Sequence, residues 1–116
     1  MIDLSKIPEN LIDLDDGLSR VGGDEEFFIE LLKDLAELGQ DSLIKFKEAV
    51  DSSDGELLRI TAHSLKGASG NLGAKELQNL AFELEQCGRE KNFDNSTALI
   101  NKIEDEITRL INFINS

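Results

Sequence analysis

The sequence predicts an all-α fold, an antiparallel four-helix bundle with a short additional N-terminal helix. Apolar residues recur at helical spacing along most of the 116 residues, and a chain of this length can bury a single core. One proline and the absence of tryptophan and tyrosine favour helices over strands. We therefore expect a single domain over residues 1–116, with a helical segment over about 1–22 and the bundle over about 24–115.

The N-terminal helix has the weakest pattern. Pro8 is expected to open it, and the pair Gly22 and Gly23 to end it after about Val21. Asp24 then places negative charge at the start of the second helix. Six apolar residues recur at helical spacing in that second helix: Phe27, Phe28, Leu31, Leu32, Leu35 and Leu38.

A break is expected in the middle of the second helix. Gly39 is placed to bend or end it, and Asp41 to cap a continuation that reaches about Val50. A polar loop follows, in which Ser53 and Glu56 have the spacing of a capping box for the next helix.

Three helices complete the predicted bundle. The first covers about 54–72, and Gly73 is expected to end it in a left-handed conformation. A helix over about 74–90 follows almost directly, so the two should pack antiparallel. The last helix covers about 94–115, and five apolar residues mark its buried side: Leu99, Ile103, Ile107, Leu110 and Ile114.

The composition argues against several functions. A net charge of −12 at pH 7 opposes binding to nucleic-acid phosphates and to anionic membrane surfaces. No apolar run has the length of a membrane span, and the N-terminus lacks the pattern of a signal peptide, so we expect a cytoplasmic protein. The single cysteine, Cys87, cannot form an internal disulfide and is expected to be a buried apolar side chain.

His63, the only histidine, is predicted on the solvent side of its helix. On a helical wheel it lies about 140° from the apolar stripe, and Arg59, Lys66, Gly67 and Gly70 share its arc. A helical glycine costs about 1 kcal/mol relative to alanine, so two on an exposed arc require an explanation. We expect both glycines to leave the imidazole open to the close approach of another protein. The stripe itself comprises Leu58, Ala62, Leu65, Ser69 and Leu72.

Lys66 and Arg59 lie one turn after and one turn before His63 and form a basic patch on an acidic protein. A phosphoryl group brings nearly two negative charges and three acceptor oxygens, which such side chains can meet with charge-assisted hydrogen bonds. The same cations disfavour the imidazolium form, and a neutral ring has a nitrogen lone pair that can attack phosphorus. His63 is therefore a candidate nucleophile for phosphoryl transfer.

The stretch from Ala62 to Ala74, AHSLKGASGNLGA, resembles the signature of histidine-containing phosphotransfer (HPt) domains. The resemblance implies that His63 accepts a phosphoryl group from the aspartyl phosphate of a response-regulator receiver domain and passes it to another receiver. It implies that Glu85 hydrogen-bonds the inner ring nitrogen and orients the imidazole, and that Lys66 stabilises the phosphoryl group. The charge of Glu85 opposes that of Lys66 at the ring, and the sequence leaves open which of the two dominates.

No enzyme activity of its own is expected for the chain. It has no glycine-rich phosphate loop for ATP and no defensible cluster of carboxylates for a metal, so we predict no cofactor and no metal site. The receiver is expected to bring Mg²⁺. The predicted partners are receiver domains, a hybrid sensor histidine kinase, or both, with the chain itself a monomer.

Four residues are predicted to dock the receiver around His63. Ile60 and Phe82 are apolar side chains that the helical wheels place outside the core. Gln78, on the same face as Phe82, and Arg59 complete the set.

Two alternatives remain open for the sequence. One is an inhibitory module that binds a receiver or kinase and never carries phosphate. The other is the phosphoacceptor domain of a chemotaxis-type histidine kinase, which receives phosphate from a kinase domain. The start at Met1 and the stop after the last helix favour a free-standing protein, although an excised domain would look the same. A dimetal four-helix enzyme is disfavoured because it needs Glu-x-x-His pairs and more than one histidine.

Overall fold

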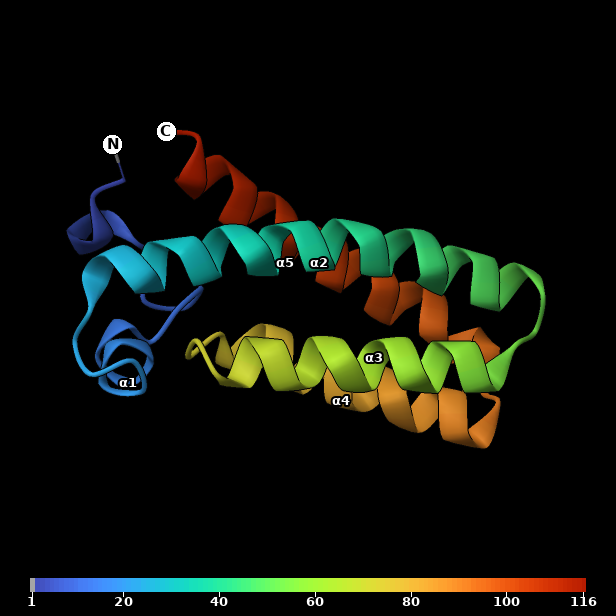
Figure 1. Ribbon diagram of the computed structural model, residues 1–116. Helices are drawn as coiled ribbons and strands as arrows, with labels where there is room; N and C mark the ends of the chain where they lie inside the picture. The colour runs from blue at the N-terminus through green and yellow to red at the C-terminus, as the bar shows by residue number, and fades with distance from the viewer. Residues whose placement is uncertain (1) are drawn as a thin grey trace.

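The computed structural model describes residues 2–116, all of whose regular elements are helical. Met1, the first residue of the predicted domain, lies outside this range. Figure 1 shows four long helices that run in alternating directions along the long axis of the molecule. The predicted all-α bundle is confirmed. The elements in chain order are a 3-10 helix Leu4–Lys6, α1 Leu14–Ser19, α2 Glu25–Asp51, α3 Gly55–Gly70, α4 Lys75–Glu90 and α5 Phe93–Ile114.

The four long helices form a closed ring of neighbours. α3 packs against α2 and α4, and α5 packs against the same two helices from the other side. Large apolar side chains from all four helices fill the centre, where their burial provides most of the drive to fold. The most completely buried include Phe28, Phe46, Leu58, Leu65, Leu84 and Ile103.

Side-chain caps fix where the helices begin. Asp24 accepts a hydrogen bond from Phe27 N at 3.1 Å, and Asp54 accepts one from Leu57 N at 3.0 Å. The predicted capping box with Ser53 and Glu56 is therefore wrong, because Ser53 adopts a left-handed conformation with φ of 53° and Asp54 takes its place as the cap.

Gly73 ends α3 as predicted. Its φ of 75° is left-handed, and Ala74 N donates to Ser69 O at 3.0 Å across the turn. This is a Schellman arrangement, in which a residue without a side chain takes the left-handed position most easily. The turn brings α4 back beside α3, so the predicted antiparallel pairing of these two helices is confirmed (Figure 1).

The predicted break at Gly39 is wrong. α2 runs without interruption through both Gly39 and Asp41, and Asp41 caps nothing. Gly39 is buried against Ile107 of α5, and a Cβ there would overlap Cδ1 of that isoleucine. The glycine therefore serves packing between α2 and α5, which overrides its low helix propensity.

The N-terminal segment is less helical than predicted. Pro8 does not open a helix, since its carbonyl oxygen accepts hydrogen bonds from Leu11 N and Ile12 N in a turn. The helix starts only at Leu14, with Asp13 as its cap. Leu11 and Ile12 are buried, so this segment covers one end of the core without needing a regular helix.

Two further expectations concern burial and membranes. Cys87 is buried as predicted. None of the helices within residues 2–116 combines the length and the apolar character that crossing a membrane requires.

Candidate functional site

α3 presents His63 to solvent. Its side chain is 63% exposed, whereas the five residues of the predicted inward stripe are buried. The orientation expected from the helical wheel is confirmed. A ring this open is accessible to a group carried by another protein.

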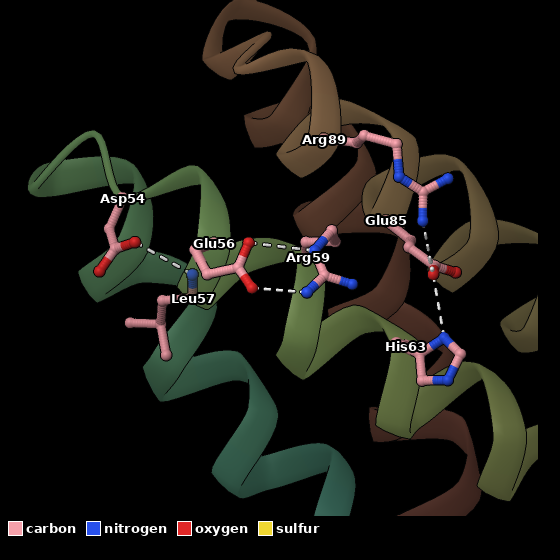
Figure 2. A network of polar contacts seen from close by, with 7 residues as sticks. All are labelled: Asp54, Glu56, Leu57, Arg59, His63, Glu85 and Arg89. Carbon is pink, nitrogen blue, oxygen red and sulfur yellow. Dashed lines mark hydrogen bonds and ion pairs between the residues drawn. The ribbon is translucent and has the colours of Figure 1, made fainter.

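α4 places Glu85 against the inner side of the His63 ring. Glu85 is buried, and its Oε2 lies 2.9 Å from His63 Nδ1, as Figure 2 shows. A carboxylate can only accept a hydrogen bond, so in a neutral ring the proton resides on Nδ1 and the lone pair on Nε2. Nε2 points away from Glu85 in Figure 2. The contact that the family resemblance implied is therefore present, and the free lone pair faces outward.

Two cations share the Glu85 carboxylate with His63. Lys66 Nζ lies 2.7 Å from Oε1, and Arg89 Nη2 lies 3.5 Å from Oε2, the oxygen that also meets the ring. Burial raises the pKa of the Glu85 carboxyl, but the Lys66 ammonium and the His63 ring N–H outweigh it, so the pKa lies below its usual value. Glu85 is therefore a carboxylate at neutral pH.

Arg89 is the residue of this network that the sequence prediction missed. The available signal was its spacing, because a glutamate and an arginine four residues apart on a helix are neighbours on its surface. The pairing of Lys66 with Glu85 was also not predicted, since Lys66 was expected, together with Arg59, to face the phosphoryl group.

Gly67 and Gly70 have different surroundings. A Cβ at Gly67 would meet nothing within 4 Å, so the predicted opening beside His63 exists there. A Cβ at Gly70 would lie 2.5 Å from Nε2 of Gln78. The expectation that Gly70 extends the open surface is therefore wrong: its missing side chain makes room for Gln78 from α4.

Arg59 does not face His63 as a free cation. Its guanidinium pairs with Glu56, one turn earlier on α3, where Nε lies 3.1 Å from Oε2 (Figure 2). Glu56 and Glu85 thus neutralise much of the basic patch that the sequence predicted. Of the two predicted cations, Lys66 is the one that pairs with Glu85, the partner of the ring.

Apolar surface borders the site as predicted. Ile60 is 50% exposed and Phe82 is 47% exposed. Lys66 Nζ lies 5.5 Å from the centre of the Phe82 ring, so the aromatic side chain extends the same surface from α4. The surface that surrounds His63 therefore combines apolar and charged groups, which is typical of protein interfaces.

No group of three or more potential metal ligands occurs among residues 2–116. The chemistry available at this surface is that of an exposed nucleophilic nitrogen, a buried carboxylate that fixes its tautomer, and cations beside it. A surface with these groups can accept an electrophilic group that a partner protein delivers.

Comparisons with known proteins agree with this arrangement. The family model described as Hpt domain matches residues 25–113. A crystal structure of histidine-containing phosphotransfer protein B from Pseudomonas aeruginosa PAO1 has a TM-score of 0.79 and 31% sequence identity, over 89% of this chain and 90% of that chain. The HPT domain of a sensor hybrid histidine kinase from Shewanella has a TM-score of 0.78 and 22% identity, over 93% of each chain. No curated protein sequence matches the chain.

Proposed function

The chain belongs to the Hpt domain family and is a histidine phosphotransfer carrier of phosphorelays, and we propose that Nε2 of His63 is the atom that carries the phosphoryl group. The observation that carries this proposal is the hydrogen-bonding distance of 2.9 Å between Glu85 Oε2 and Nδ1 of a ring that is 63% exposed. It holds the proton on the inner nitrogen and leaves the outer nitrogen as the nucleophile.

In the proposed transfer, the Nε2 lone pair attacks the phosphorus of an aspartyl phosphate on a receiver domain. A nitrogen–phosphorus bond forms as the bond between phosphorus and the aspartyl oxygen breaks, and the aspartate leaves as a carboxylate. The Nδ1 proton stays on the ring, which therefore gains positive charge. Glu85 lies in position to compensate this charge, because its buried carboxylate accepts the Nδ1–H hydrogen bond. Transfer to a second receiver is the reverse reaction with a new aspartate.

Lys66 is proposed to stabilise the phosphoryl group. Its ammonium pairs with Glu85 at 2.7 Å and sits on the same exposed arc as His63. A phosphoryl group on Nε2 would compete for this ammonium with up to two negative charges. Arg89, whose Nη2 lies 3.5 Å from Glu85 Oε2, would then keep the buried carboxylate paired.

The partner is proposed to supply the remaining chemistry. Hpt domains interact with receiver domains and hybrid kinases, and we propose that this chain docks receivers through Ile60, Phe82, Gln78 and Arg59. The receiver would contribute the aspartate and Mg²⁺, while this chain contributes an oriented nucleophile and acts as a carrier with no enzymatic turnover of its own. A cytoplasmic monomer that binds neither nucleic acid nor membrane fits the net charge of −12 and the closed bundle.

The test is transfer from a panel of phosphorylated receiver domains in the presence of Mg²⁺. Acid-labile phosphate should appear on the wild-type protein and not on His63→Gln, which retains a polar side chain of similar size. Label on both proteins would place the acceptor elsewhere and refute the assignment.

The same experiment separates the two alternatives. Receivers that bind the chain without transferring phosphate would favour an inhibitory module. Label that appears only with a histidine kinase catalytic domain and ATP would favour the phosphoacceptor of a chemotaxis-type kinase. Gly67, which leaves open space beside His63, favours transfer because an inhibitor has no need of a clear approach to the ring.

A further inference from the structure

α3 and α4 approach each other backbone to backbone at a pair of glycines. A Cβ at Gly88 would lie 2.6 Å from Arg59 N, 2.9 Å from Arg59 Cα and 2.8 Å from Gly55 O. A Cβ at Gly55 would lie 2.6 Å from Gly88 O. These neighbours are main-chain atoms, which cannot rotate away as a side chain does. Only glycine fits at either position while the two helices keep this separation.

On α4 the glycine contact lies one turn from Glu85, and on α3 it extends from Gly55, two turns before His63, to Arg59, one turn before it. Arg59, which Gly88 touches, precedes His63 by four residues, and Gly88 follows Glu85 by three. Residues three or four apart lie on the same face of a helix. The contact and the hydrogen bond therefore occupy adjacent turns of the same interface, where α3 and α4 run side by side (Figure 1).

We infer that Gly88, with Gly55 opposite it, is a positioning residue for phosphoryl transfer, because this contact sets the helix separation at which Glu85 reaches Nδ1 of His63. The inference rests on the proposed role of His63 and extends it to residues that touch neither the ring nor the phosphoryl group.

The distances make the effect of one methyl group substantial. Non-bonded carbon atoms settle at about 3.5–4.0 Å, so an alanine Cβ that starts 2.9 Å from Arg59 Cα requires a local shift of roughly 0.6–1.1 Å. A donor and acceptor 2.9 Å apart that separate by this amount pass beyond the range of a good hydrogen bond. Glycine inside a helix also costs about 1 kcal/mol relative to alanine, and close approach of the helices is what offsets that cost here.

Gly88→Ala is the first variant to test. Gly55→Ala is the second, because it adds a methyl group to the same contact from α3. The first readout is the tautomer of His63 in the chain alone, measured by ¹⁵N chemical shifts of the ring near neutral pH. His63 is the only histidine, so its signals are unambiguous. We expect the population with the proton on Nδ1 to fall in both variants, and transfer from a phosphorylated receiver to slow by about 10- to 100-fold.

Gly39→Ala is the matched control. It also adds a methyl group to a packed helical glycine, but its Cβ would meet the Ile107 side chain between α2 and α5. We expect it to alter thermal stability while the His63 tautomer stays as in the wild type. This separates positioning of the imidazole from a general loss of packing.

The outcomes distinguish this inference from the proposed function. Folded Gly88→Ala and Gly55→Ala proteins with a wild-type tautomer and transfer rates within twofold of wild type would overturn the positioning role. Failure of both variants to fold would assign the glycine contact to stability alone and would also overturn it. A wild-type protein that accepts no phosphate from any donor would refute the proposed function, yet the tautomer comparison would still decide whether the glycines position the ring.

Discussion

Lys66 Nζ lies 2.7 Å from Oε1 of Glu85, the carboxylate whose other oxygen meets His63. The cation expected to serve the phosphoryl group is therefore already bound to the group that orients the imidazole. One buried carboxylate links the residue that would receive the phosphoryl group to the residue that would stabilise it. Changes at Lys66, Arg89 or Glu85 should consequently affect transfer in different and separable ways.

Lys66→Gln is expected to slow transfer to His63 by about 10- to 100-fold, because a charge-assisted hydrogen bond to the phosphoryl group contributes roughly 1.5–3 kcal/mol. Rapid-quench measurement with a phosphorylated receiver gives the rate. The control is Lys75→Gln, which removes the same charge from an exposed pair with Asp13 at 2.8 Å, away from the histidine. Equal slowing in both variants would reduce the role of Lys66 to long-range electrostatics.

Arg89→Gln should leave the stability of the fold nearly unchanged, because Arg89 is about half exposed and 3.5 Å from its partner. It should lower the equilibrium share of phosphate on His63 by roughly 1.5- to 5-fold, since Glu85 would lose its remaining cation when Lys66 turns to the phosphoryl group. In a Lys66→Gln background this effect should vanish, because no lysine then leaves Glu85. A double-mutant cycle on the transfer equilibrium measures this coupling, and strictly additive effects would contradict it.

The fold was largely predictable because its signals are local and periodic. Apolar spacing placed the inward stripe of α3, and the face opposite that stripe was correctly assigned to His63. The errors at Gly39 and Gly70 have one physical cause. A glycine in a helix looks the same in the sequence whether it breaks the helix, exposes a surface or admits a neighbour, and only the partner decides: Ile107 in one case and Gln78 in the other.

The site was predictable in its acceptor and in Glu85, but not in its pairing pattern. Glu85 was assigned through the family resemblance, and its separation from His63 by 22 residues left no purely local signal. Lys66 and Arg59 were both predicted as cations, yet each pairs with a carboxylate that the wheel alone did not assign to it. The Lys66–Glu85 pair joins two helices and depends on their separation and rotation, which one sequence does not specify. Arg59 and Glu56 are three residues apart on α3, so for that pair the spacing was an available local signal.

Gly67→Gln should fold at least as stably as the wild type, because nothing lies within 4 Å of the added Cβ and glycine is the poorer helix former. Transfer should nevertheless fall at least tenfold, since a long side chain one turn after His63 would lie over the exposed ring. Thermal unfolding checks the expected stability, and transfer rates check the expected loss of activity. Gly67→Ala, which adds a single methyl group, should lose much less activity, and a fully active Gly67→Gln protein would show that the open space is not used.

Glu85 should make the stability of the fold depend on pH in a defined direction. Burial raises its pKa, but the Lys66 ammonium and the His63 ring hold the pKa below the ordinary value of 4.5. The folded state therefore binds this proton less readily than the unfolded state, so the stabilisation is present above about pH 4.5 and is lost as the pH falls through the folded pKa. Urea unfolding from about pH 5.5 to 3 should show the free-energy difference between wild type and Glu85→Gln shrinking toward acid. A difference that grows toward acid would mean that the folded pKa is raised.

Phe82→Ser should weaken receiver binding without destabilising the bundle. The ring is 47% exposed and contacts Lys66 on the surface beside His63, so its removal creates no large cavity but deletes an aromatic contact of the kind that anchors interfaces. The control is Ile44→Ser, which removes an apolar side chain 67% exposed on α2. Affinity for the receiver should fall about tenfold or more for Phe82→Ser and remain within about twofold for Ile44→Ser. Equal losses in both variants would indicate a general effect of surface polarity, whereas a sharp drop in melting temperature for Phe82→Ser alone would show that the ring supports the core.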